Sequence, residues 1–190
     1  MTRVALFGGS FNPPHVAHQL VALYILETQD VDELWFVPTF AHPFGKQLAP
    51  YDDRLAMLAH ATAALGARVK ISRAEEELAG RPGFVASRTL DLVEYLATQG
   101  HALRLVVGTD ILGEAHKWHR WDDVIAAAPL IVVGRAGHAL PPGSVATGVT
   151  MPEISSTQIR ALLAAGDNDG LRGLLPREVL RYIAEHGLYR

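Results

Sequence analysis

The sequence runs Val4-Ala5-Leu6-Phe7-Gly8-Gly9-Ser10-Phe11-Asn12-Pro13-Pro14-His15-Val16-Ala17-His18 near its start, and this stretch decides the fold. Four consecutive apolar residues are typical of a buried parallel strand, and the mostly apolar run 19–27 that follows indicates a buried helix. The glycines can adopt positive φ and let a ligand approach the backbone, and prolines are tolerated just ahead of a helix. The stretch therefore predicts a strand, a glycine turn and a helix over 15–28.

Two histidines stand three residues apart at the start of this predicted helix. Unpaired backbone N–H groups and the positive end of the helix dipole favour an anion there, above all a phosphate. On a helix, His15 and His18 share one face with their Cβ atoms about 5–6 Å apart, so both imidazoles can reach one polyphosphate. A lone histidine would more often pack in a core, but this pair beside Gly8 and Gly9 favours phosphate binding.

Residues 8–18 resemble the first signature of the T/HxGH nucleotidyltransferase superfamily, and most closely that of the nicotinate/nicotinamide mononucleotide adenylyltransferases. A second stretch far downstream, Ile154-Ser155-Ser156-Thr157-Gln158-Ile159-Arg160, is similar to the ISSTxIR motif of that family. Two motifs in the expected order are more specific than either alone. The chain departs from the bacterial pattern at Ala17, where the family has glycine, but the residue remains small.

The composition describes an ordinary globular chain that we expect to form one domain over 1–190. Of the 190 residues, 49% are hydrophobic and 19% are charged, and the net charge of −3 disfavours nucleic-acid binding. The absence of cysteine rules out a disulfide, a thiolate nucleophile and a cysteine-based zinc site. Because a strand is predicted directly after Met1-Thr2-Arg3 and no apolar run approaches membrane-spanning length, we expect a cytoplasmic protein without a signal peptide or a membrane partner.

Predicted strands and helices alternate along the whole chain. Strands are indicated at 4–7, 33–38, 69–71, 103–107, 130–133 and 149–151, and helices at 15–28, 52–65, 87–98 and 176–189. This alternation predicts an α/β fold with a Rossmann-like, doubly wound parallel sheet. Glu75-Glu76-Glu77 is interpreted as a solvated acidic turn, because adjacent side chains do not converge on a metal ion.

A glycine and an acid follow the predicted strand 103–107, as Gly108-Thr109-Asp110. This is the usual setting for holding a ribose, although Asp110 could instead cap a helix. The family has a similar tripeptide at this point, and a similar arginine segment where Arg135 stands. The resemblance thus implies that a set of residues from three segments binds ATP: Gly8, Gly9, Ser10, Phe11, Gly108, Asp110 and Arg135.

The second motif adds further phosphate contacts. Ser155 or Ser156 can cap a helix that begins at Thr157, which directs backbone N–H groups toward an anion. Arg160 falls in the predicted first turn, where a cation opposes the helix dipole unless it faces a phosphate; the alternative is a surface charge. The resemblance implies that Ser156 and Thr157 bind ATP and that Arg160 belongs, with His15 and His18, to the catalytic residues.

Three residues are candidates for binding the mononucleotide acceptor. Lys46 lies in the predicted loop 39–50 and matches the basic end of a family motif, or is a solvated lysine. Phe84, where the family has a hydroxyl-bearing stretch, could stack on a pyridine ring or face the core. Trp118 resembles the family tryptophan that packs against the pyridine, a cation–π contact if the ring is cationic.

The resemblance implies transfer of AMP from ATP to nicotinate mononucleotide, with deamido-NAD and pyrophosphate as products, in NAD biosynthesis. Mg²⁺ bound mainly by the triphosphate is implied by the chemistry, and no protein metal site is predicted. Alternatives are nicotinamide mononucleotide as acceptor, pantetheine-phosphate adenylyl transfer, cytidylyl transfer and a non-catalytic nucleotide-binding module. A zinc site on His116 and His119 is disfavoured because no separate ligand group completes it. The residues leave the oligomeric state open.

Overall fold

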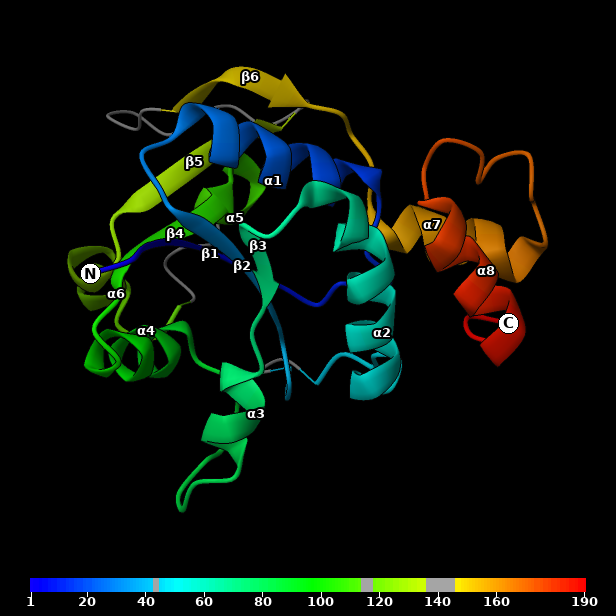
Figure 1. The fold of residues 1–190 in the computed structure, drawn as a ribbon. Helices are drawn as coiled ribbons and strands as arrows, with labels where there is room; N and C mark the ends of the chain where they lie inside the picture. Colours follow the sequence, from blue (N-terminus) through cyan, green and yellow to red (C-terminus); the bar gives the residue numbers. More distant parts are fainter. Residues whose placement is uncertain (43–44, 114–117, 136–145) are drawn as a thin grey trace.

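The computed structural model describes residues 1–42, 45–113, 118–135 and 146–190 and contains a central six-stranded sheet (Figure 1). The strand order is β3-β2-β1-β4-β5-β6, and every neighbouring pair is parallel. The strands are β1 (Arg3–Gly9), β2 (Glu33–Pro38), β3 (Val69–Ile71), β4 (Ala102–Gly108), β5 (Leu130–Arg135) and β6 (Ala146–Met151). This order confirms the predicted doubly wound sheet, in which the winding direction reverses between β1 and β4.

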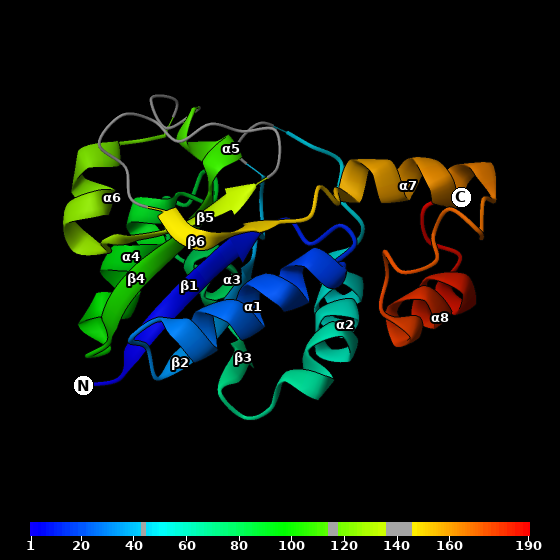
Figure 2. The same cartoon turned by 90° about the horizontal axis from the view of Figure 1, so that it is seen from above.

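Helices cover both faces of the sheet (Figures 1 and 2). Along β1, Ala5 packs with the buried residues of α1 (Val16–Thr28) and α2 (Tyr51–Thr62). Its neighbours Val4 and Leu6 pack instead with α4 (Thr89–Thr98) and α6 (Trp121–Ala127). Successive side chains of a strand point to opposite faces, so β1 contributes to both layers of core.

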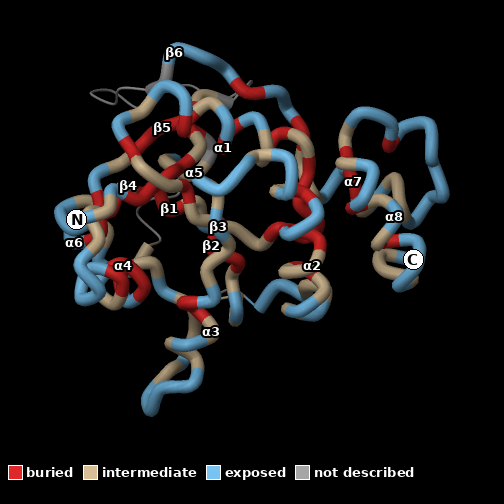
Figure 3. The backbone as a smooth tube through the Cα atoms, viewed as in Figure 1, coloured by how far each residue is buried: buried red, intermediate tan, exposed pale blue. Residues whose placement is uncertain are grey.

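A third apolar cluster lies outside the two sheet layers. Helix α8 (Arg177–His186) packs on α2, and Met57 of α2 shares this cluster with Ile183 of α8 and with Ile159 of α7 (Ser156–Ala165). Buried segments therefore occur in α7 and α8 as well as in the sheet (Figure 3). Ala17 of the first motif belongs to this same cluster, so the α7–α8 unit is joined to the start of α1.

Most predicted helices are found with small shifts at their ends. Helix α1 begins at Val16, with His15 as its N-cap, and α4 begins at Thr89 rather than at residue 87. The predicted helix 52–65 is α2 followed by a short 3₁₀ turn, η1 (Ala63–Leu65), and a four-residue helix, α5 (Thr109–Leu112), follows β4 directly. No helix in the described parts of the chain is long and apolar enough to cross a membrane.

The interpretation of residues 75–77 as a solvated acidic turn is wrong. These residues lie in helix α3 (Ala74–Ala79), and the helix turns Glu75 inward so that its side chain is 8% exposed. One Glu75 oxygen, Oε2, accepts a hydrogen bond of 2.8 Å from the backbone N–H of Phe40. A buried carboxylate needs such partners, and the loop after β2 supplies one.

Candidate active site

A cavity of about 570 Å³ lies at the carboxyl ends of the central strands, where the strand order reverses. In doubly wound sheets this is the position at which ligands bind. Its wall includes Gly8 at the end of β1 and Gly108 at the end of β4. The structure brings together nine of the predicted site residues in this wall: Gly8, Gly9, Ser10, His15, His18, Lys46, Gly108, Trp118 and Ser156.

Other predicted site residues stand elsewhere. Phe11 is buried beneath the wall, against Phe36 and His18. Thr157 and Arg160 lie behind the first motif, on α7. The side chains of Asp110 and Arg135, and His116 of the zinc alternative, lie outside the described part of the structure.

His15 and His18 form a reciprocal pair at the start of α1. The backbone N–H of His15 donates to Nδ1 of His18 at 3.0 Å, and the two rings stack with their centroids 3.7 Å apart. Because Nδ1 of His18 is an acceptor, a neutral His18 carries its proton on Nε2. His15 is 4% exposed, and the ring of His18 also packs edge-on against Phe11. The pair therefore presents a held imidazole, with its N–H at Nε2, in the cavity wall.

The two glycines of the motif have different roles. A Cβ at Gly9 would lie 3.1–3.4 Å from three atoms of the Phe11 ring, and Phe11 itself has a φ of 45°. A Cβ at Gly8 would meet nothing within 4 Å. Gly9 is thus required by the packing of Phe11, whereas Gly8 keeps open space at the end of β1 for a ligand.

Three carbonyl groups of the loop between β1 and α1 accept hydrogen bonds from other elements. Arg54 Nη1 donates to the Ser10 carbonyl at 3.0 Å, and Arg160 Nη1 donates to the Asn12 carbonyl at 2.8 Å. The hydroxyl of Ser156 donates to the Pro13 carbonyl at 2.9 Å. Helices α2 and α7 therefore fix the motif loop from behind, and the second sequence motif acts directly on the first.

Arg54 is a site-supporting residue that the sequence analysis did not single out. It is 1% exposed, and its Nε also donates to the Ala49 carbonyl at 3.0 Å. Burial lowers the pKa of the Arg54 guanidinium, but this group remains charged in proteins. The signal was its spacing, because Arg54 shares a helical stripe with the buried Met57, Leu58 and Ala61.

Glu75 is a second residue that was missed, and it connects two loops that border the cavity. Burial has the largest effect on the pKa of the Glu75 carboxyl and raises it, whereas hydrogen bonds from Ser87 and from the Phe40 N–H act to lower it. The hydroxyl oxygen of Ser87 in turn accepts from the Ala41 N–H at 3.2 Å. Glu75 and Ser87 thus hold the loop after β2 against the segment that precedes α4.

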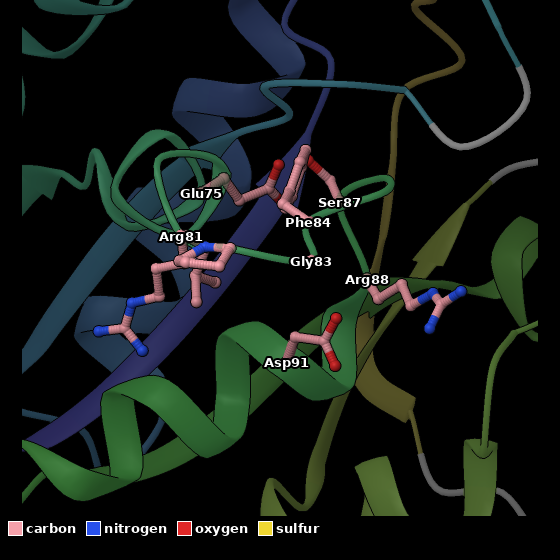
Figure 4. A pocket seen from close by; sticks show the side chains of 9 residues that line it. Glu75, Arg81, Gly83, Phe84, Ser87, Arg88 and Asp91 are labelled. Carbon is pink, nitrogen blue, oxygen red and sulfur yellow. The ribbon is translucent and has the colours of Figure 1, made fainter.

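Phe84 lines a second, smaller pocket of about 170 Å³, together with Arg81 and Asp91. This pocket shares Glu75, Ser87 and Arg88 with the larger cavity. Figure 4 shows Phe84 next to Glu75 and Ser87, with Asp91 at the start of α4 below them. The Phe84 side chain therefore stands beside Glu75 and Ser87, which also line the larger cavity.

Basic and aromatic groups also line the cavity. Exposed Lys46 and half-buried His42 come from the loop after β2, and burial, Lys46 and Arg54 lower the pKa of His42. Trp118 lies in the wall and packs edge-on against Trp121, with ring centroids 5.2 Å apart. The cavity thus combines imidazoles, a lysine and an indole with helix N-termini, which is a suitable lining for phosphates and an aromatic ring.

The fold and the site define a nucleotidyltransferase, and comparisons with known proteins identify its family. The "Cytidylyltransferase-like" family model matches residues 6–162. A "Probable nicotinate-nucleotide adenylyltransferase" of Anaeromyxobacter sp. (strain K) is 52% identical over 98% of this chain and 96% of its own. A protein of the same name from Myxococcus xanthus (strain DK1622) is 40% identical over 98% of this chain and 94% of its own.

A solved structure has the same fold. Plasmodium falciparum nicotinic acid mononucleotide adenylyltransferase complexed with NaAD superposes with a TM-score of 0.82 at 17% identity, and covers 100% of this chain and 98% of its own. The chain belongs to the cytidylyltransferase-like family and, within it, to the nicotinate-nucleotide adenylyltransferases. The family expected from the two sequence motifs is confirmed.

Proposed function

We propose that this chain transfers AMP from ATP to the phosphate of nicotinate mononucleotide and releases nicotinate adenine dinucleotide and pyrophosphate. The observation that carries the proposal is the position of the first motif. Residues 8–18 lie where the strand order reverses and share one cavity with Lys46 and Trp118. Relatives named for this reaction align with nearly the whole chain, which favours it over pantetheine-phosphate adenylyl transfer and over a non-catalytic module.

The reaction does not require a strong general base. The acceptor phosphate is already an oxyanion near neutral pH, so it can attack the α-phosphorus of ATP without losing a proton to the enzyme. The enzyme must align this phosphate with the bond that breaks and must offset the negative charge that develops. A site built from N–H donors and cations suits both tasks.

We assign His18 to the α-phosphate. Its proton on Nε2 can be donated in a hydrogen bond to the oxygen on which charge develops, and the backbone N–H groups at the start of α1 add to this stabilisation. His15 stacks on His18 and caps the helix, so it holds the plane of the catalytic ring. Gly8, Gly9 and Ser10 let the triphosphate approach the loop, and Phe11 supports them from below.

The leaving pyrophosphate is assigned to the start of α7. Ser155 caps this helix by accepting from the Gln158 N–H at 3.2 Å, and Ser156 lies in the cavity wall. Arg160 has five N–H donors, of which its bonds to the Asn12 carbonyl and the Thr157 hydroxyl account for two. Arg160 and Ser156 bind the motif loop, and we assign the β- and γ-phosphates to these two residues and Thr157, which lie at or just after the part of α7 that enters the cavity wall.

The adenosine and the acceptor take opposite ends of the cavity in this assignment. Gly108, Asp110 and Arg135, at the ends of β4 and β5, serve the adenosine half. Lys46 orients the acceptor phosphate, Trp118 stacks on the pyridine ring, and Phe84 shapes the region behind that ring. His42 adds a second nitrogen donor beside Lys46.

Nucleotidyl transfer from ATP generally uses a divalent metal, and we propose that it is Mg²⁺ here. Within residues 1–42, 45–113, 118–135 and 146–190, no three His, Asp or Glu side chains gather in a way that could hold a metal ion. Mg²⁺ prefers phosphate oxygens and water, so it fits this site as an ion that ATP brings with it. When bound, it would neutralise part of the triphosphate charge.

Pyrophosphate release with ATP and Mg²⁺ tests this proposal when three acceptors are compared: nicotinate mononucleotide, nicotinamide mononucleotide and 4′-phosphopantetheine. We expect the highest kcat/KM with nicotinate mononucleotide. A higher kcat/KM with nicotinamide mononucleotide would contradict the proposed acceptor. Activity with 4′-phosphopantetheine alone would contradict the proposed role in NAD biosynthesis. Binding of ATP without release under any condition would favour a non-catalytic module.

A further inference from the structure

Asn12 receives hydrogen bonds from three distant segments, and one of them comes from the residues after α8. We propose that Tyr189 is a positioning residue for adenylyl transfer, whose phenol holds Asn12 so that the motif loop keeps the conformation that receives the ATP phosphates. The inference rests on the proposed function and deepens it. It assigns a part of the site to a segment 177 residues away from the motif in sequence.

The contacts at Asn12 carry this inference. The Tyr189 hydroxyl donates to Asn12 Oδ1 at 2.8 Å, and the same oxygen accepts from the Ala49 N–H at 3.0 Å. The carbonyl of Asn12 accepts from Arg160 at 2.8 Å. Asn12 is 3% exposed, so water cannot readily replace a lost partner. The loop is thus held by the segment before α2, by α7 and by Tyr189 together.

The backbone at both ends of this contact is unusual. Phe11, directly before Asn12, has a φ of 45°, and Tyr189 has a φ of 62°. Left-handed backbone is unfavourable for residues with a side chain and persists only where surrounding contacts impose it. The two conformations place the Asn12 amide and the Tyr189 phenol against each other, and packing of Phe11 under Gly9 depends on the same loop shape.

The Tyr189 phenol stays protonated and can therefore always donate its hydrogen bond. Burial is the main reason that the pKa of its phenol is raised, so the hydroxyl keeps its proton throughout the neutral range. Arg160 and Arg54, which both donate to the motif loop, lie close enough to Tyr189 to act on its charge. The phenol therefore adds a donor to the Asn12 side-chain oxygen, beside the donors that hold the loop carbonyls, without adding a charge beside the phosphates.

Asn12 lies between Ser10 in the cavity wall and His15 at the start of α1, so a shift of Asn12 moves both. These residues belong to the ATP side of the proposed site. Loss of the Tyr189 hydroxyl should therefore act on the affinity for ATP and on turnover. The KM for the mononucleotide, whose predicted contacts are Lys46 and Trp118, should change little.

The experiment compares Tyr189→Phe with the matched variant Tyr182→Phe. Tyr182, on α8, donates its hydroxyl at the same distance of 2.8 Å, but to Asp53 Oδ1 of α2 rather than to the motif loop. We expect Tyr189→Phe to lower kcat/KM for ATP by roughly 5- to 20-fold, the effect of losing one buried hydrogen bond. Tyr182→Phe should keep wild-type kcat, and both variants should show a similar change in melting temperature.

Two results would overturn the inference. One is a kcat/KM for ATP within twofold of wild type in Tyr189→Phe. The other is an equal loss of kcat/KM in Tyr182→Phe, which would show a general stability effect.

Calorimetric affinity for a non-hydrolysable ATP analogue separates this inference from the proposed function. If wild type binds the analogue but adenylates no pyridine mononucleotide, the proposed acceptor fails. Weaker analogue binding by Tyr189→Phe would still support the role of Tyr189, and equal binding would reject it. Absence of analogue binding in wild type would reject both.

Discussion

At the scale of single residues, the proposed catalysis depends on one ring nitrogen, Nε2 of His18. The bond from the His15 N–H to Nδ1 of His18 sets which ring nitrogen of a neutral His18 carries the proton, and stacking and aromatic contacts hold the ring. We expect His18→Ala to lower turnover by about 10²–10⁴-fold, because it removes a donor to the transition state. Steady-state kinetics would measure this, with His60→Ala, an exposed histidine of α2, as the control that keeps activity. Near-wild-type turnover in His18→Ala would refute its assignment.

Substitution of the two glycines of the motif should have different effects, on folding stability for Gly9 and on ATP binding for Gly8. Gly9→Ala places a methyl group 3.1 Å from the Phe11 ring, and we expect it to cost about 1–3 kcal/mol of unfolding free energy through overpacking. Gly8→Ala adds a methyl group to open space, so stability should be retained while KM for ATP rises. Thermal unfolding and kinetics of both variants check this, and equal destabilisation would contradict it.

Protonation of Glu75 should make the free energy of unfolding depend on pH. Its pKa is raised mainly by burial, so the folded state binds a proton more readily than the unfolded chain. Its contribution is fully present below the ordinary pKa of a glutamate and is lost as pH rises through the raised value. Denaturant unfolding should thus show that Glu75→Gln gains stability relative to wild type as pH rises through this window. A constant difference across that window would contradict the assignment.

At the scale of elements, the start of α7 is the part that the sequence described best. Ser155 was one of two proposed caps, and it accepts from the Gln158 N–H as a cap does. The helix begins at Ser156, one residue earlier than expected, which puts Arg160 beyond the first turn and in reach of Asn12. The family resemblance implied a phosphate role for Arg160, but its contact with the first motif depends on packing between distant segments, which no local pattern encodes.

Loss of the α7 cap should weaken both stability and the site. We expect Ser155→Ala to cost about 1 kcal/mol, a fall of roughly 2–4 °C in melting temperature for a chain of this size. KM for ATP should rise as well, because Ser156 and Arg160 follow the helix start. Ser155→Asn keeps an acceptor at the cap and should restore most of the melting temperature. Unchanged melting in Ser155→Ala would show that the cap is not needed.

At the scale of the whole molecule, apolar runs and glycine turns were enough to predict the doubly wound sheet. The central strands β2, β1, β4 and β5 are short and mostly buried, so their type and direction follow from local pattern and from the right-handed crossover rule. The third cluster was not predicted, because the apolar faces of α7 and α8 do not specify α2 as their partner. Glu75 was missed for a similar reason: three adjacent glutamates look alike until the fold buries one of them.

In the proposed reaction, the bond that breaks in ATP joins the α- and β-phosphates, and the AMP passes to nicotinate mononucleotide. Incubation of wild-type protein with Mg²⁺, nicotinate mononucleotide and ATP labelled at the α-phosphorus tests it directly. We expect all transferred label in nicotinate adenine dinucleotide, with one pyrophosphate released for each dinucleotide formed. Label found in free AMP or in ADP would show hydrolysis or phosphoryl transfer instead, and would contradict the account.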